Sequence, residues 1–238
     1  MPTRWLRGCC VTGTDTGVGK TVVAAAIVAG LRTLGSEVRA YKPLLTGTDE
    51  PPDPVWPPDH ELLARVAGTA PTDVVLRTYG PAVSPHLAAE LAGEPAPSPE
   101  TIAAWVRDST PRGALAVVEG IGGLLVPLGP DADVRALAGE LALPLIVAAR
   151  PGLGTINHTL LTLEAARAAA LPVAGVVLTP WPQEPGVIER SNRETIARRG
   201  EVEVAVLPPV PAPEPAALAR AAAGLPLLRW LAEDPSAA

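Results

Sequence analysis

Residues 10–21 read Cys10-Val11-Thr12-Gly13-Thr14-Asp15-Thr16-Gly17-Val18-Gly19-Lys20-Thr21, and an alanine- and valine-rich run follows them. Apolar residues, a glycine-rich turn and then Gly-Lys-Thr predict a strand, a phosphate-binding loop and a helix N-terminus. The backbone N–H groups of such a loop and the positive end of the helix dipole form an anion site. Lys20 is expected to reach the β- and γ-phosphates, and the Thr21 hydroxyl to bind Mg²⁺. The stretch therefore predicts a site for a nucleoside triphosphate.

The loop is one residue longer than the common pattern G-x-x-x-x-G-K-[ST], because Gly13 precedes Gly19 by six positions. A chance glycine-rich turn is the alternative interpretation. A Lys-Thr pair at a strand-to-helix junction favours phosphate binding over that alternative.

Length and composition indicate one α/β domain over residues 1–238, with about 229–238 expected as a frayed tail. The net charge of −6 at pH 7 and the lack of a basic run argue against a nucleic-acid surface. Cys9 and Cys10 are neighbours in an apolar run, so we expect two buried thiols in a reducing compartment rather than a disulfide. The longest apolar stretch, Val22 to Leu31, is too short to span a bilayer. We therefore expect a cytoplasmic protein with no membrane or nucleic-acid partner.

The basic residues are strongly biased toward arginine. Of the 19 lysines and arginines, 17 are Arg and only Lys20 and Lys42 are Lys. A compact ammonium fits a crowded phosphate site, and its pKa can shift when it is desolvated. An ordinary exposed residue is the alternative for Lys42, but the bias favours a function for both lysines.

Apolar runs alternate with helical patterns along the chain, which predicts a doubly wound, mostly parallel sheet flanked by helices, of the P-loop NTPase type. After the first strand, we expect strands near residues 37–43, 74–76, 114–118, 144–149, 173–178 and 201–206. We expect helices over residues 21–34, from 59, from 84, over 98–107 and over 156–170. Residues 46–58 and 208–215 read as proline-rich loops.

Polar residues collect where the predicted strands end, which is where doubly wound sheets bind ligands. Glu119 closes an apolar strand, and a carboxylate there can hold Mg²⁺ together with Thr21 and Asp59. Asp59 is equally well explained as a helix N-cap. Gly120, with two more glycines after it, would let the backbone approach a ligand closely.

Gly152-Leu153-Gly154-Thr155 opens a predicted helix and offers free N–H groups suited to a carboxylate. His60, His86 and His158 have no metal-ligand spacing, so a structural role is favoured for each.

Several blocks together resemble the dethiobiotin synthetase family. They fall in that family's order, cover about residues 8 to 180, and are Val11 to Thr21, Tyr41-Lys42-Pro43 with Thr46-Gly47, Ser84-Pro85-His86, Val118 to Gly123 and Gly154 to His158. The resemblance implies a homodimeric, Mg²⁺-dependent enzyme of biotin synthesis. Its substrates would be 7,8-diaminopelargonic acid, CO₂ and ATP, and the reaction would pass through a carbamate and a carbamic-phosphoric anhydride to dethiobiotin.

The same resemblance implies roles for particular residues. It makes Lys42, Lys20 and Thr16 catalytic, and Thr21, Asp59 and Glu119 ligands of Mg²⁺. The nucleotide would be bound by Gly17, Val18, Gly19, Lys20, Thr21, Val22, Asp59, Glu119, Gly120, Ile121, Gly122, Thr179, Pro180, Pro208, Pro209 and Val210. The substrate would be bound by Thr16, Lys42 and Thr46 and, at the dimer interface, by Gly154, Thr155, Ile156 and Asn157.

Two departures from the family pattern concern the base of the nucleotide. The chain has Thr179-Pro180 where the family commonly has Asn-Asp, and proline has no backbone N–H. The stretch Pro208-Pro209-Val210-Pro211 also differs from the family's base-contacting loop. The sequence therefore leaves base selectivity open.

Three other classes compete with this interpretation. A partitioning or cell-division-site ATPase would carry a second lysine early in the loop, where this chain has Asp15. A small GTPase would need an Asn-Lys-x-Asp motif, and the sequence has none. A cobyrinate-amidating relative would carry an added glutamine-hydrolysing domain, for which we expect no room in 238 residues.

Overall fold

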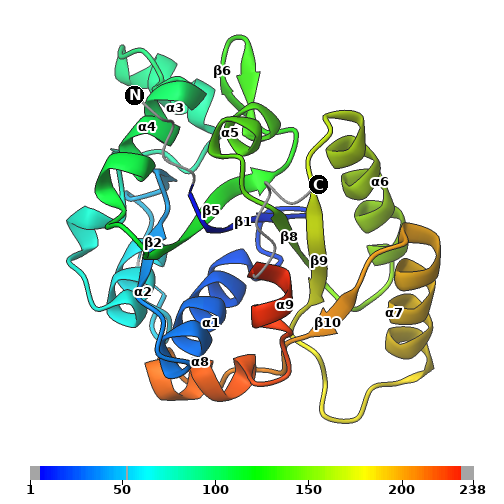
Figure 1. Ribbon diagram of the computed structural model, residues 1–238. Helices are drawn as coiled ribbons and strands as arrows, with labels where there is room; N and C mark the ends of the chain where they lie inside the picture. The colour runs from blue at the N-terminus through cyan, green and yellow to red at the C-terminus, as the bar shows by residue number, and fades with distance from the viewer. Residues whose placement is uncertain (1–5, 52, 232–238) are drawn as a thin grey trace.

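A six-stranded parallel sheet forms the centre of the molecule, with strand order β10-β9-β8-β1-β5-β2 (Figure 1). The computed structural model describes residues 6–51 and 53–231. The strands of this sheet are β1 (Gly8–Gly13), β2 (Val38–Tyr41), β5 (Leu115–Gly123), β8 (Leu145–Ala149), β9 (Val173–Leu178) and β10 (Val204–Val206). Because β1 lies between β5 and β8, the phosphate-binding loop leaves the sheet near its middle. The predicted doubly wound fold is confirmed.

Helices cover both faces of the sheet, since alternate residues of each strand point to opposite sides. Cys9 packs into the core on one face and Cys10 into the core on the other. The first face is covered by α1 (Lys20–Thr33), α2 (Asp59–Ala67), α8 (Pro215–Ala222) and α9 (Leu227–Leu231). The second face is covered by α4 (Pro99–Ser109), α5 (Val134–Leu141), α6 (Thr155–Ala168) and α7 (Val187–Gly200).

The two cysteines are free and buried, as the sequence predicts. Burial raises the pKa of the Cys10 thiol to about 12 and that of Cys9 further, so both stay protonated at neutral pH. They fill space in the core and are not reactive thiols.

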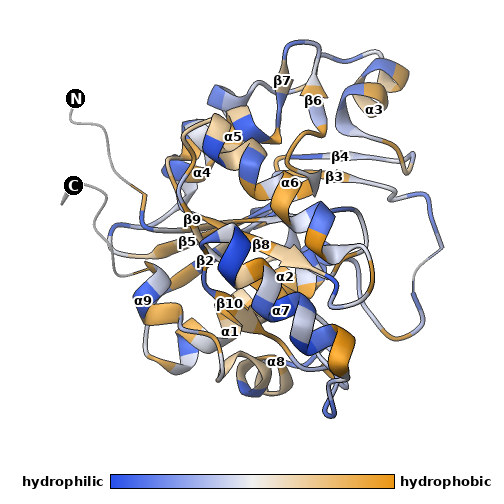
Figure 2. Ribbon diagram, turned by 90° about the vertical axis from the view of Figure 1, so that its right-hand side faces the viewer, coloured by the Kyte–Doolittle hydropathy of each residue, from blue (hydrophilic) through white to orange (hydrophobic). Residues whose placement is uncertain are grey.

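Smaller elements gather at one side of the molecule (Figure 2). There β3 (Leu44–Thr46) pairs in parallel with β4 (Arg77–Tyr79), and β6 (Pro127–Gly129) pairs antiparallel with β7 (Ala132–Asp133). The 3-10 helix η1 (Pro71–Asp73) precedes β4, and α3 (Pro85–Ala92) contacts β3, β4 and β6.

The structure corrects several predicted elements. The strand expected near residues 74–76 is wrong, because a 3-10 turn fills Pro71–Asp73 and β4 begins only at Arg77. The last strand of the sheet begins at Val204 rather than 201, since Glu201 ends α7 in the left-handed conformation. Helices α5, α7 and α8 were not predicted. The hydrophobic pattern of α7 is weak because charged residues are spread around the helix and only Asn192, Ile196 and Gly200 are buried.

The expectation of a frayed tail is wrong for residues 229–231, which belong to α9. Trp230 is buried, and its Nε1 donates a hydrogen bond of 2.9 Å to Glu203 Oε2. Its ring lies so close to Gly175 that a Cβ there would meet it at 2.3 Å. The large apolar ring therefore anchors α9 on β9, and the rest of the predicted tail, 232–238, lies outside the described residues.

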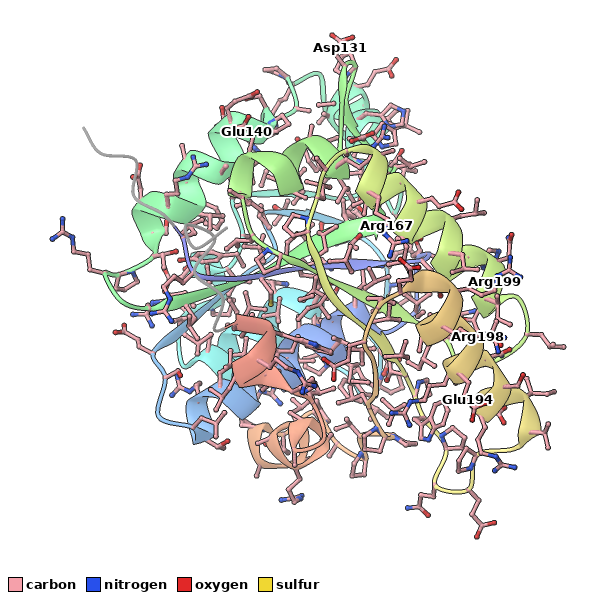
Figure 3. All side chains as sticks on the ribbon, turned by 45° about the vertical axis from the view of Figure 1, so that its right-hand side comes forward. Asp131, Glu140, Arg167, Glu194, Arg198 and Arg199 are labelled. Carbon is pink, nitrogen blue, oxygen red and sulfur yellow. The ribbon has the colours of Figure 1, made fainter. Side chains whose placement is uncertain are left out.

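Exposed arginines lie on the helices that cover the second face of the sheet. Figure 3 labels Glu194, Arg198 and Arg199, which are exposed on α7, and Arg167 of α6, whose guanidinium donates to the Gly200 carbonyl. None of the helices within residues 6–51 and 53–231 has the length and apolar character needed to cross a lipid bilayer.

Candidate active site

A cavity of about 800 Å³ lies at the carboxyl ends of β1, β2 and β5. This is the edge at which a doubly wound sheet binds ligands. Twelve residues that the sequence analysis assigned to the site line it: Thr16, Gly17, Gly19, Lys20, Thr21, Val22, Lys42, Thr46, Asp59, Glu119, Ile121 and Gly122. Residues from well-separated parts of the chain therefore meet here.

The phosphate-binding loop connects β1 to α1 in a conformation that suits an anion. Gly19 caps α1 with φ of 92°, a backbone conformation in which glycine is favoured. A Cβ at this position would lie 2.9 Å from Thr179 Cγ2, so space also requires glycine. Among the described residues no side chain caps the N-terminus of α1. Its first N–H groups are therefore available to a phosphate.

Lys42 occupies the centre of a buried polar cluster. Its Nζ donates to Asp59 Oδ2 and, at 2.7 Å, to Glu119 Oε1. The Thr21 hydroxyl donates to the same Glu119 oxygen at 2.9 Å. Lys42 is 4% exposed and Glu119 is 1% exposed, so this is an ion pair largely removed from water.

The charges of this cluster depend on one another. Burial disfavours the Lys42 ammonium, but the carboxylates of Glu119 and Asp59 outweigh burial and raise the pKa of Lys42. Burial likewise disfavours the Asp59 carboxylate, and Lys42 outweighs it, so the pKa of Asp59 is lowered. Burial raises the pKa of Glu119, and the Lys42 ammonium opposes that rise. The geometry is that of a salt-bridged lysine between two acids.

Lys20 lies in the same cavity but has a different partner. Its Nζ donates to the Asp15 backbone carbonyl at 2.8 Å, within the loop. Burial lowers the pKa of Lys20, the nearby charge of Lys42 lowers it further, and Glu119 opposes both. A phosphate would supply Lys20 with the anion that it lacks here.

The oxygen atoms of Thr21, Asp59 and Glu119 fit a magnesium ion. Mg²⁺ prefers oxygen ligands and uses one or two carboxylates together with phosphate and water. Glu119 Oε2 is buried and has no hydrogen-bond partner among the described residues, so it has a lone pair available for a cation. The described residues contain no group of three or more His, Cys, Asp or Glu side chains that could hold a metal by themselves. Nucleotide and water oxygens would therefore complete the coordination.

Asp59 is not the N-cap of α2. Pro58 takes that position, and no described side chain caps the helix. The carboxylate of Asp59 turns to Lys42 instead, which favours the ligand interpretation over the capping one.

The remaining predicted site residues do not line the cavity. Val18 and Gly120 are buried and do not line the cavity. Gly154 is the N-cap of α6, and Thr155, Ile156 and Asn157 are its first residues. Thr179 is buried, and its backbone N–H donates to the Ala149 carbonyl at 2.9 Å. Ligand contacts of the stretches 154–157, 179–180 and 208–210 stay predictions.

Sequence reasoning missed Trp56, which lines the cavity from the proline-rich loop. Asp53 Oδ1 accepts hydrogen bonds of 2.8 Å from the backbone N–H groups of Val55 and Trp56, and this turn positions the indole. An aspartate three residues before a large aromatic in a polar loop is the signal that could have identified it.

Among the histidines, the structure gives His86 a local partner: its Nδ1 lies 2.9 Å from Ser84 Oγ, at the start of α3. This contact agrees with the structural role that the sequence favours.

Known proteins resemble this chain in sequence and in fold. Residues 7–217 match the AAA domain family. The ATP-dependent dethiobiotin synthetase BioD of Mycobacterium sp. (strain JLS) is 43% identical over 197 residues, which cover 82% of this chain and 85% of the relative. The protein of the same name from Mycobacterium avium (strain 104) is 43% identical over 199 residues, or 83% and 85% of the two chains.

Among solved structures, the cell division protein FtsY from Thermotoga maritima superposes with a TM-score of 0.50 at 13% identity, covering 93% of this chain and 69% of that one. At that identity the likeness concerns the fold alone.

Proposed function

The chain belongs to the dethiobiotin synthetase family, and from that membership we propose that it closes the ring of dethiobiotin from 7,8-diaminopelargonic acid, CO₂ and ATP. It is an ATP-dependent ligase of biotin biosynthesis. The observation that carries the detailed proposal is the position of its only two lysines, which line one cavity beside the phosphate-binding loop.

The reaction brings a carbamate and a triphosphate together, and the two positively charged lysines offset the repulsion between these anions. One substrate amine adds to CO₂ and loses a proton, which gives a carbamate. A carbamate oxygen then attacks the γ-phosphorus of ATP, and ADP leaves. The second amine attacks the carbonyl carbon of the resulting carbamic-phosphoric anhydride, phosphate leaves, and the ring closes. Lys20 and Lys42 offset the repulsion between the carbamate and the triphosphate and stabilise the charge of the transferred group.

Other residues position the two substrates. The N–H groups at the start of α1 and the loop residues Gly17 to Lys20 bind the phosphates. Thr16 and Thr46 line the cavity beside Lys42 and are placed to donate hydrogen bonds to the substrate. Mg²⁺ would be held by Thr21, Asp59 and Glu119, where it would neutralise phosphate charge.

We propose that the working form is a homodimer of single-domain subunits and that a second copy completes the substrate site. The α6 N-terminus, from Gly154 to Asn157, would bind the substrate carboxylate through N–H groups of its first turn. Leu153 is 89% exposed and Leu161 is 56% exposed on this helix and the turn before it. Apolar side chains exposed to that degree support burial against another subunit.

The deciding measurement is phosphate release from ATP with Mg²⁺ and bicarbonate, in the presence and absence of 7,8-diaminopelargonic acid. We expect release that depends on the diamine, with dethiobiotin among the products. Release that is indifferent to the diamine would contradict the proposal and favour a switch ATPase.

A further inference from the structure

The ammonium of Lys42 occupies the place that a metal ion would take. Its two carboxylate partners, Asp59 and Glu119, are two of the three residues proposed to hold Mg²⁺, and the third, Thr21, bonds to the same Glu119 oxygen. All four side chains form one connected cluster. Two acids facing each other in a largely buried site need a positive charge between them, and here Lys42 supplies it.

A metal ion and this ammonium cannot share the position. Glu119 Oε1 already accepts two hydrogen bonds, from Thr21 and Lys42. Magnesium coordinates oxygens at about 2.0–2.1 Å in an octahedral arrangement, so it would replace these donors wherever it binds Glu119 Oε1 or Asp59 Oδ2, whereas Glu119 Oε2 has no partner among the described residues and can bind it directly. Two adjacent cations would also repel each other, most strongly beside the buried Glu119 and less beside Asp59, whose side chain is 41% exposed.

We propose that Lys42 is a placeholder for the metal. In the nucleotide-free protein its ammonium neutralises Asp59 and Glu119, and the arrival of Mg²⁺ with the nucleotide displaces it into the cavity. This inference rests on the proposed function. It adds that the lysine becomes available to the anionic carbamate only once the metal–nucleotide complex is in place.

The backbone around Lys42 allows this exchange without a larger rearrangement. The Lys42 N–H donates to the Val74 carbonyl at 2.8 Å, and Pro43 follows, so the Cα is held at the end of β2. The flexible four-carbon side chain can move while the backbone stays. Thr16 and Thr46 line the same cavity, and their hydroxyl groups can accept hydrogen bonds from the displaced ammonium.

Lys20 provides the contrast within the same cavity. Its ammonium is held by the Asp15 carbonyl of the loop and by neither carboxylate. A phosphate alone should therefore recruit Lys20, whereas release of Lys42 should need the metal. The two lysines respond to different parts of the metal–nucleotide complex.

The presence of only two lysines makes this directly measurable. In protein labelled with ¹⁵N at lysine Nζ, NMR should give two amine resonances, assigned with the variant Lys20→Arg. We expect a non-hydrolysable ATP analogue in EDTA to shift the Lys20 resonance only. Adding Mg²⁺ should then shift or broaden the Lys42 resonance, as the ion pair is lost.

The outcomes separate the inference from the proposed function. A Lys42 resonance that is unchanged by Mg²⁺ and nucleotide, while that of Lys20 responds, would overturn the placeholder proposal and leave the nucleotide site intact. If neither resonance responds to any nucleotide, the proposed function itself fails.

A second measurement uses Mn²⁺ as a probe of the nucleotide-free protein, followed by the loss of its free-ion EPR signal. Replacing Lys42 by methionine removes the competing cation, so Lys42→Met should bind Mn²⁺ about tenfold or more tightly than wild type at pH 8. Lys20→Met is the matched control, with an expected gain of about threefold or less because Lys20 contacts neither carboxylate. Equal affinities in wild type and Lys42→Met would contradict the proposal.

Discussion

The two parts of the predicted site differ in how the structure builds them. At the phosphate part, Lys20, Thr21, Lys42, Asp59 and Glu119 line one cavity, and hydrogen bonds join the last four of them. At the outer part, the stretches 154–157, 179–180 and 208–210 lie outside that cavity. The first part is assembled by the fold of one chain.

The difference follows from what each part uses. The phosphate part consists of a loop between a strand and a helix, and of residues at neighbouring strand ends, so the topology of the sheet fixes it. The outer part consists of surface turns and a helix N-terminus whose proposed partners are a nucleotide base, a substrate carboxylate and a second subunit. Substitutions should therefore have large effects in the first part and small ones at the edge of the second.

The largest effect is expected for Lys42→Ala. Loss of the ammonium that faces the transferred group should lower turnover by about 10²- to 10³-fold. In EDTA, binding of an ATP analogue should change by about threefold or less, since the loop and α1 hold the phosphates. Dethiobiotin formation and calorimetric titration measure the two quantities.

Arg39→Ala is the matched control for Lys42→Ala, because Arg39 is a partly exposed cation on β2, the strand that leads to Lys42, and pairs with Glu37 at 3.2 Å. Circular dichroism melts check that both variants fold. Turnover like that of wild type in Lys42→Ala would remove this residue from the mechanism.

A smaller effect is expected for Glu119→Gln. The amide keeps the shape of the side chain but lacks the charge and one acceptor, so the Mg²⁺ concentration for half-maximal activity should rise about tenfold. Glu140→Gln, on the outer surface of α5 (Figure 3), controls for the loss of a carboxylate. If the Mg²⁺ titrations of the two variants coincide, Glu119 is not a metal ligand.

The affinity for nucleotide should fall at alkaline pH, because Lys20 loses its charge there. Burial lowers the pKa of this lysine, and the phosphates bind its protonated form. Affinity should therefore be intact below the lowered pKa and be lost as pH rises through it. Calorimetry of an ATP analogue measures this, and Lys20→Arg should give a flat profile because guanidinium stays charged. A profile in wild type as flat as that of Lys20→Arg would contradict the expected titration.

Sequence reasoning identified those site residues that stand in short motifs or belong to a rare residue type. The glycine-rich loop, the apolar run closed by Glu119, and the scarcity of lysine each identified residues that meet in the cavity. The parallel sheet followed from alternating apolar runs, and β9 has the predicted bounds. These features depend on residue type and spacing, which a single sequence displays.

It failed where tertiary contacts decide the outcome. Trp230 buries a tail that composition alone marks as frayed, because Gly175 leaves room for its ring. The side chain of Asp59 turns to Lys42, a partner 17 positions away, and no local pattern distinguishes that from capping. The spacing of Asp53 and Trp56 indicates a turn, but only the folded chain brings the indole to the wall of the cavity.

The smallest effect is expected for Thr179→Val, which tests the boundary between the two parts. Valine keeps the methyl group that packs near Gly19 and replaces the hydroxyl with a second methyl group. Since Thr179 is buried outside the cavity, ATP affinity should change by less than about twofold. A hydrogen bond from this hydroxyl to the nucleotide would be worth about 1 kcal/mol, and its loss would weaken binding about fivefold. A loss of that size would place the end of β9 in the nucleotide site. Thr179 would then belong to the phosphate part of the site and not to the outer part.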